Sequence, residues 1–176
     1  MSADNQQGRP SGSICYYIAG FVDGEGSFHV AIQKSSNVKL GWQVIPEFHV
    51  SQNVERTATL RTIQEVLGCG YIKPNHRERA NDKSNVLVVR NHQDLVNKVV
   101  PFFRKYKLIS TKNVDFLKFA EIVDLIHDKQ HLKLKGLKRI LKIAFSMNQS
   151  GKYRKMKLET ILDSLVPSET IRQAPK

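Results

Sequence analysis

Alternating apolar and polar residues mark the extended segments of this chain. Residues 27–34 and 42–52 alternate with a period of two, which predicts two half-buried strands. Shorter apolar runs at 70–73 and 85–90 predict two more strands, and the four together predict an antiparallel sheet. Pro46 lies inside the second strand and indicates an edge position or a bulge there.

Apolar residues recur every three or four positions in the other segments, which predicts helices. These helices are expected near residues 13–26, 54–67, 94–106, 111–127, 131–148 and 158–165. Pro101 should break or bend the third of them, and Thr111 should cap the fourth. The order of elements predicts an α+β fold with an αββαββα core, in which helices cover one face of the four-stranded antiparallel sheet.

A single domain of mixed class fits the length of 176 residues. We expect this domain to span 13–166, with a polar disordered arm at 1–12 and a flexible tail at 167–176. No stretch approaches the roughly 18 consecutive apolar residues of a membrane-spanning helix, so no contact with a membrane is predicted.

The first predicted helix combines an apolar face with small residues. Its apolar face is expected to consist of Tyr17, Ile18, Phe21 and Val22. Gly20 and Gly24 are four residues apart, with Ala19 beside them, and small residues in such an arrangement let a second helix backbone approach closely. The helix is therefore expected to pack against another helix. Because the chain contains no second copy of it, the partner should be a second copy of the chain.

A carboxylate, Glu25, lies at the end of this helix between Gly24 and Gly26. The carboxyl end of a helix is the negative end of its dipole, where a carboxylate is unfavourable by about 0.3–1 kcal/mol. We therefore expect a positively charged group close to Glu25.

The formal charge of +12 points to a polyanionic partner. Residues 1–97 contain ten Lys and Arg against nine Asp and Glu, a net charge of +1. Residues 98–176 contain eighteen against seven, a net charge of +11. Phosphate contacts are therefore expected mainly from the C-terminal half of the chain.

Polar side chains at every second position of the sheet have the spacing that is needed to read base edges in a major groove. A polar sheet face can also simply meet water. The predicted contacts from the sheet and the hairpin after its third strand are His29, Ala31, Gln33, Glu47, His49, Lys73, Asn75 and Arg77.

The segment 18–26, with the sequence IAGFVDGEG, resembles the signature of the LAGLIDADG homing endonucleases, and the resemblance covers about residues 14–165. It implies an intron-encoded, site-specific endonuclease that makes a staggered break in both strands of a long pseudo-palindromic DNA site. In this family two motif helices pack against each other, and the acidic residue at the position of Glu25 binds a divalent metal. Glutamate replaces the aspartate of the signature here and can still ligate such an ion.

The resemblance also implies the ligands and the interface. Glu25 and Gly24 would bind Mg²⁺, with Mn²⁺ as a substitute and Ca²⁺ supporting DNA binding without cleavage. The homodimer interface would contain Tyr17, Ala19, Gly20, Asp23 and Gly24.

Residues 48–56 resemble the second strand of the family and the turn after it. By this match Gln52 would help to position the attacking water, and Arg56 would stabilise charge on the phosphate. The family also supplies a lysine to the active-site pocket, for which Lys112 is the first choice and Lys107 the alternative. A basic loop near the C-terminal end would hold the phosphate backbone through Lys152, Arg154 and Lys155.

Two other functions use the same fold. An RNA maturase would bind intron RNA, and nothing in the sequence excludes this as a second activity. A DNA-binding protein without catalysis would be expected to lack the acidic residue and the polar pocket residues. Because Glu25, Gln52, Arg56 and Lys112 are all present, the endonuclease is the favoured function.

Overall fold

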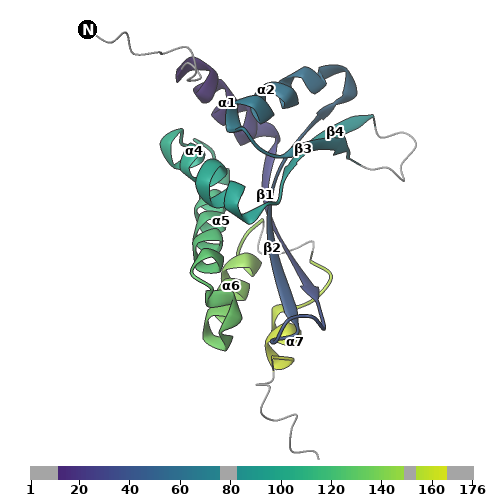
Figure 1. The fold of residues 1–176 in the computed structure, drawn as a ribbon, viewed down its shortest axis with the longest axis vertical. Coiled ribbons are helices and arrows are strands. Elements are labelled where there is room, and N and C mark those ends of the chain that lie inside the picture. Colours follow the sequence, from purple (N-terminus) through teal and green to yellow (C-terminus); the bar gives the residue numbers. More distant parts are fainter. Residues whose placement is uncertain (1–11, 76–82, 149–153, 166–176) are drawn as a thin grey trace, which may run out of the picture.

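Residues 12–75, 83–148 and 154–165 are described by a computed structural model (Figure 1). The chain begins with helix α1 (Gly12–Glu25), which continues into strand β1 (Gly26–Lys34) without a loop. Within these described residues, no helix combines the length and the apolar character that crossing a membrane would require.

The predicted four-stranded antiparallel sheet occupies the centre of the fold, and its strand order is β1-β2-β4-β3. β2 spans Trp42–Asn53, β3 spans Tyr71–Pro74 and β4 spans Ser84–Val89. β4 pairs with β2 only over residues 48–53, so Pro46 lies beyond β4. Its missing N–H therefore costs no hydrogen bond to β4, and β2 is locally an edge strand at that point.

Helical segments connect and follow the strands. They are η2 (Val54–Arg56), α2 (Thr57–Leu67), α3 (His92–Asp94), the π-helical η3 (Leu95–Val99), α4 (Val100–Lys105), α5 (Lys112–His127), η4 (Gln130–Leu132), α6 (Leu134–Phe145) and α7 (Leu158–Asp163). The predicted bend at Pro101 takes the form of η3, and Pro101 lies in the first turn of α4, where a missing N–H is tolerated. The helix predicted over 131–148 is shorter at both ends.

The N-cap of α5 differs from the prediction. Thr111 occupies the capping position, but its side chain makes no capping hydrogen bond. The hydroxyl oxygen of Ser110 instead accepts from the backbone N–H of Lys112 at 3.1 Å. A hydroxyl one residue earlier in the chain therefore satisfies a backbone donor at the start of this helix.

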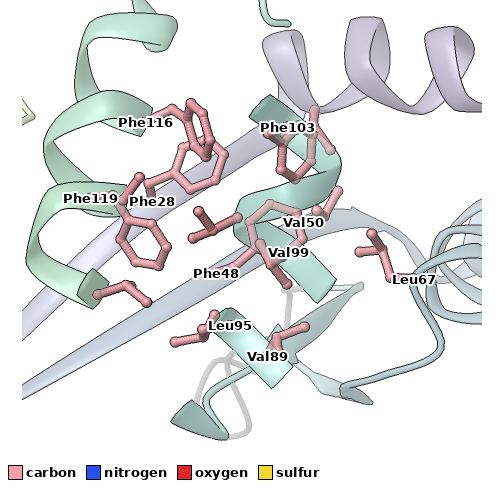
Figure 2. Packing of buried hydrophobic residues seen from close by; sticks show 14 of the residues in the cluster. Phe28, Phe48, Val50, Leu67, Val89, Leu95, Val99, Phe103, Phe116 and Phe119 are labelled. Atoms are coloured by element: carbon pink, nitrogen blue, oxygen red, sulfur yellow. The ribbon is translucent and has the colours of Figure 1, made fainter. Parts of the chain in front are cut away.

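Helices α4, α5 and α6 lie on one side of β1 and β2, where their apolar side chains meet the sheet (Figure 1). Phe28 and Phe48 pair across β1 and β2 with their ring centroids 5.4 Å apart. Phe103 from α4 and Phe116 and Phe119 from α5 each pack within 5.5 Å of the Phe28 ring, centroid to centroid (Figure 2). Aromatic pairs of this kind contribute about 0.5–1.5 kcal/mol beyond their buried area, so they hold α4 and α5 on β1.

A second apolar cluster fixes the far end of the β1–β2 pair. Its buried members are Trp42, Leu137, Leu141, Ile161 and Leu165. The indole N–H of Trp42 also donates to the hydroxyl of Ser164 at 2.9 Å. α6 and α7 are thereby attached to the start of β2.

Strand β1 is an edge of the sheet, and three of its backbone carbonyls are bound by side chains from later in the chain. The carbonyl of Gly26 accepts from Lys112 Nζ at 2.6 Å, and that of Phe28 accepts from Asn148 Nδ2 at 3.1 Å. The carbonyl of Val30 accepts from Nη1 of an arginine, Arg154, at 3.0 Å. These residues alternate along β1, so their carbonyls point to the same side, away from β2. The exposed edge is therefore blocked to pairing with another strand.

Helix α1 places a different set of side chains in the core than the sequence suggested. The buried residues are Cys15, Ile18, Ala19 and Val22. Of the four residues expected on one apolar face, Ile18 and Val22 are buried, Phe21 is partly buried against the core and Tyr17 is 53% exposed. Both sides of α1 carry apolar residues, and the pattern by itself did not show which side faces this chain's own core.

Three histidines, His92, His127 and His131, gather where α3, the end of α5 and η4 meet. The rings of His92 and His127 stack with their centroids 6.1 Å apart. Both ring nitrogens of His92 are buried and have no hydrogen-bond partner among the described residues. Burial, followed by the neighbouring charges of His127 and His131, lowers the pKa of His92 below its usual range.

We expect the substitution His92→Phe to reduce the loss of stability in acid. Below a pH of about 6.5 His92 is protonated in the unfolded chain, whereas in the folded chain its lowered pKa keeps it neutral. The unfolded state therefore binds more protons, and the stability of the wild type falls as the pH drops through this range. Replacing two unpaired buried polar atoms by apolar ones should also leave stability at pH 7 unchanged or raise it by up to about 1 kcal/mol.

Urea unfolding between pH 7.5 and pH 5 measures both effects. Gln93→Phe, at the exposed neighbouring position, is the matched control and should keep the wild-type pH dependence. If stability falls with decreasing pH equally in the His92→Phe variant and the wild type, His92 is not the source of the acid-induced loss of stability.

Candidate active site and the polar sheet face

The junction between α1 and β1 is sterically tight at Gly26. A Cβ atom at this position would lie 2.6 Å from Cγ1 of Val22 and 2.8 Å from the Val22 carbonyl oxygen. Because a side chain could not be accommodated without moving the backbone, glycine is required here. The junction holds Glu25, the last residue of α1, exposed at the end of the helix.

Lys112 at the start of α5 caps the end of α1. Its ammonium donates to the carbonyl oxygens of Val22 at 3.1 Å, Gly24 at 3.1 Å and Gly26 at 2.6 Å. An ammonium has three N–H groups, so these three acceptors use all of them. The positive group that the sequence predicted near Glu25 is present.

Lys112, and not the alternative Lys107, is thus the lysine that contacts the helix end. Burial lowers the pKa of Lys112 below its usual range, while the charges of Asp23 and Glu25 act in the opposite direction. A cation at this position offsets the negative end of the helix dipole, where Glu25 would otherwise be unfavourable.

Asp23 ties the same helix end to the segment before α5. One carboxylate oxygen accepts from the backbone N–H groups of Ile109 at 3.0 Å and Ser110 at 2.8 Å, and the other accepts from the Ser110 hydroxyl at 2.5 Å. Burial raises the pKa of Asp23, but the hydrogen bonds from Ser110 and Ile109 and the charge of Lys112 outweigh it, so the pKa lies below its usual range. Its carboxylate is engaged within its own chain, in place of the intermolecular contact expected for it.

A cavity of about 430 Å³ opens beside this helix end. It is lined by Asp23, Gly24, Gly26, Ser27, Phe28, Ser110, Thr111, Lys112, Asp115 and Asn148. Of the four predicted catalytic residues, only Lys112 is among them.

Asp115 and Asn148 belong to the wall of this cavity and were missed from the sequence. Asp115 Oδ1 accepts from the backbone N–H of Asn148 at 3.1 Å, while Asn148 also donates to Phe28 of β1. Asn148 has a positive φ of 49°, a conformation that asparagine tolerates better than most residues. No local pattern shows these contacts, because they join α5, β1 and the end of α6.

Gln52 and Arg56 lie near the end of β2, outside the cavity. Pairing of Gly26 with Val50 brings the end of β2 beside the junction of α1 and β1. The side-chain oxygen of Gln52 accepts from the backbone N–H of Asn53 at 2.8 Å, and Arg56 is exposed in η2. No hydrogen bond or ion pair in the described ranges joins either residue to Glu25, so their predicted roles remain predictions.

The oxygen donors of the helix end suit a hard divalent cation such as Mg²⁺ or Ca²⁺. Glu25 offers an exposed carboxylate, but the carbonyl of Gly24, predicted as a second ligand, is bound by Lys112. The part of the chain that the structure describes contains no group of three His, Cys, Asp or Glu that could hold an ion.

The side chains predicted to contact DNA from β1 and β2 lie on the face of the sheet opposite the core. The strand register pairs His29 with Glu47, Ala31 with Ile45, Gln33 with Gln43, and Ser27 with His49. Gln33 donates to Gln43 across the strands at 3.1 Å. These pairs alternate with the buried Phe28 and Val30, so they form one continuous row on the free face.

The other predicted sheet contacts lie toward β3 and the hairpin after it. Lys73 is exposed, and the side-chain amide of Asn75 donates to the hydroxyl of Ser84 at 3.2 Å. Arg77 lies outside the described residues.

Glu47 forms the centre of a polar cluster on this face that includes an arginine missed from the sequence. One carboxylate oxygen contacts Nε of Arg90 at 3.1 Å, and the other contacts Nε2 of His49 at 3.1 Å. Burial lowers the pKa of His29 and of His49, with the charge of Glu47 opposing the effect at both. Arg90 directly follows the apolar run of β4, and only the strand register shows that it adjoins Glu47.

Arg154, predicted to bind phosphate, has a structural role instead. Its guanidinium donates to the carbonyls of Val30 at 3.0 Å and Ala144 at 2.9 Å and lies over the Phe145 ring, 4.8 Å from its centroid. Burial lowers the pKa of Arg154. Lys155 is exposed, and Lys152 lies outside the described residues.

The outward face of α1 contains Tyr17, Gly20 and Gly24, which are all exposed. No atom of the described residues comes within 4 Å of a Cβ built at Gly20 or Gly24, so nothing in this chain requires glycine there. Ala19 was predicted on this face but is only 3% exposed and packs within its own chain.

Comparison with known proteins places these features in a family. A family model described as LAGLIDADG endonuclease matches residues 18–123. The chain is 39% identical over 134 residues to the probable intron-encoded endonuclease 2 of Neurospora crassa, covering 75% of this chain but only 28% of that protein.

Solved structures of other proteins share the fold of this chain. The crystal structure of the homing endonuclease I-TnaI matches with a TM-score of 0.73 and 36% identity, covering 86% of this chain and 95% of that one. I-SmaMI, bound to an uncleaved DNA target in the presence of calcium ions, matches with a TM-score of 0.76 and 29% identity, covering 88% of this chain and 50% of that one. The motif helix, the sheet and these matches together show that the chain belongs to the LAGLIDADG endonuclease family.

Proposed function

We propose that this chain is a homing endonuclease that dimerises through α1 and makes a staggered break in both strands of a long pseudo-palindromic DNA site. The observation that carries the proposal is the end of α1, where Lys112 and Asp23 fix the backbone and leave the carboxylate of Glu25 exposed. I-TnaI, which has nearly the same length as the matched segment, is named a homing endonuclease, and I-SmaMI was solved with DNA and calcium.

In this proposal a second copy of the chain supplies a second set of metal ligands. A close approach of two α1 helices at Gly20 and Gly24 brings two Glu25 carboxylates together at the two-fold axis. These carboxylates would repel each other unless cations lay between them. Mg²⁺ is the proposed ion, with Mn²⁺ as a substitute, and Ca²⁺ is proposed to support binding without cleavage.

A bound divalent ion supplies an activated water and stabilises the leaving oxygen in phosphodiester hydrolysis. The chain's own residues position that chemistry. Glu25 holds the ion, and Lys112 holds the helix end that carries Glu25. Gln52 orients water, and Arg56 stabilises charge on the phosphate. Gln52 lies two residues beyond Val50, which pairs with Gly26 at the junction, and Arg56 follows in η2.

The sheet provides the proposed DNA contacts. β2 has 12 residues, and at about 3.3 Å per residue it spans about 40 Å, slightly more than one turn of B-DNA. Two such sheets, one in each protomer, would cover roughly 20 base pairs. Lys155, which is exposed, is the proposed contact to the phosphate backbone.

We expect the substitution Glu25→Gln to abolish cleavage, by at least about 100-fold, while DNA binding and folding are retained. The side chain is exposed and makes no hydrogen bond or ion pair within the described chain, so its charge is not needed for stability. Cleavage of a selected target with Mg²⁺ and binding of the same target with Ca²⁺ measure the two properties. Glu55→Gln, at an exposed position in η2, is the matched control. Persistent cleavage by the Glu25→Gln variant would refute the assignment.

We expect the substitution Gly20→Leu to produce a stable monomer. A leucine has open space in the isolated chain and a helix propensity better than that of glycine by roughly 0.5–1 kcal/mol, so folding should not suffer. Close packing of two α1 helices would be blocked. Sedimentation equilibrium gives the dimer constant, and Ala58→Leu on the exposed side of α2 is the control. A Gly20→Leu variant that dimerises like the wild type would exclude α1 as the interface.

We expect the substitution Lys112→Met to lower stability by about 1–3 kcal/mol and to reduce cleavage, because three carbonyls at the junction of α1 and β1 lose their charged donor. Lys118→Met is a matched control, since Lys118 also lies on α5 and also donates to a carbonyl, that of Ser146, which is not part of the junction of α1 and β1. Unfolding by urea and single-turnover cleavage measure the two effects. Equal loss of cleavage in both variants would show that the effect is not specific to the helix end.

A further inference from the structure

The polar face of the sheet contains a cluster of Glu47, His49 and Arg90. The contacts within this cluster determine which hydrogen-bond donors and acceptors of His49 and Arg90 remain available to a ligand. Glu47 on β2 pairs with His29 on β1. On its other side the register of Phe48 with Val89 places Arg90 beside Glu47. The cluster therefore lies across β1, β2 and the end of β4, in the middle of the face that is proposed to meet DNA.

The carboxylate of Glu47 is covered, whereas its partners are more open. The exposed fractions of the side chains are 16% for Glu47, 31% for His49 and 52% for Arg90. Glu47 contacts both partners at 3.1 Å, one through each oxygen. Because Arg90 and His49 both keep access to solvent, these contacts add little to folding stability, and their main physical effect is to hold the two side chains in place.

Glu47 engages Arg90 through Nε only. The two terminal amino groups of this guanidinium, Nη1 and Nη2, make no hydrogen bond or ion pair within the described residues. They carry four of its five N–H donors in a rigid planar fork. Such a fork matches the O6 and N7 acceptors of guanine in the major groove.

Glu47 also determines the proton arrangement of His49. A carboxylate only accepts, so the ring nitrogen facing it, Nε2, is the one that carries the proton. In the neutral ring the other nitrogen, Nδ1, is then an acceptor. In the major groove the matching donors are the exocyclic amines of cytosine and adenine, and only cytosine is paired with guanine.

We propose that Arg90 is a specificity-determining residue that reads guanine in the major groove, that Glu47 is the positioning residue that holds it, and that His49 accepts from the amine of the paired cytosine. This inference rests on the proposed function, because it requires the sheet to bind double-stranded DNA. It adds that each half-site contains a G·C pair beneath Arg90.

Selection of bound sequences from a randomised DNA library, in the presence of Ca²⁺, tests the inference. We expect the wild type to enrich a two-fold related site with a fixed G·C pair in each half. Arg90→Lys keeps the charge but loses the planar fork, so preference for guanine at that one position should fall by about 10- to 100-fold while the other positions keep theirs. Glu47→Gln should relax the same position to a smaller extent.

Lys155→Ala is the matched control. Loss of a phosphate contact should weaken binding to all DNA sequences alike and leave the base preference at each position unchanged. Two outcomes would overturn the inference. If Arg90→Lys keeps the wild-type base preferences and affinity, Arg90 does not contact the DNA. If the variant loses affinity equally for all sequences, Arg90 is a phosphate contact. Failure of the wild type to enrich any DNA sequence would instead overturn the proposed function, and the inference with it.

Discussion

The contact between the Lys112 ammonium and the end of α1 is the interaction on which the site depends. Helix α1 passes directly into strand β1, which is possible because Gly26 has no side chain. The last carbonyls of the helix have no partners within the helix. Lys112 binds two of these carbonyls, those of Val22 and Gly24, and also the first carbonyl of β1, that of Gly26. It places a positive charge at the negative end of the helix. Glu25 can therefore remain exposed and charged at a position where an uncapped helix would disfavour it.

The cap at Lys112 is the first of three contacts along the edge of β1. Asn148 and Arg154 bind the next outward carbonyls, so the C-terminal half of the chain is attached to the sheet by polar contacts as well as by its phenylalanine core. Hydrogen bonds from charged groups contribute about 1.5–3 kcal/mol when buried, and two of the three donors here are cations. Part of the positive charge of this half is therefore structural, and only the remainder is free to meet phosphates.

Two distinct surfaces have no partner among the described residues. The outward side of α1 has exposed glycines with open space around them in this part of the chain, and the free face of the sheet carries mostly polar side chains in register. The proposed dimer uses both surfaces: α1 of one copy would meet α1 of the other, and the two sheets would face the DNA.

The sequence alone determined the elements that depend on local physics. Period-two alternation located the strands, helical spacing located α2 and α5, and IAGFVDGEG with its terminal carboxylate indicated both the family and the need for a nearby cation. Only the tertiary structure decided which apolar side of α1 faces its own core, because both sides are apolar and a single sequence does not separate a core from an interface. It also decided that Arg154 binds backbone carbonyls and that Arg90 adjoins Glu47, because such contacts depend on strand register and on segments far apart in the chain.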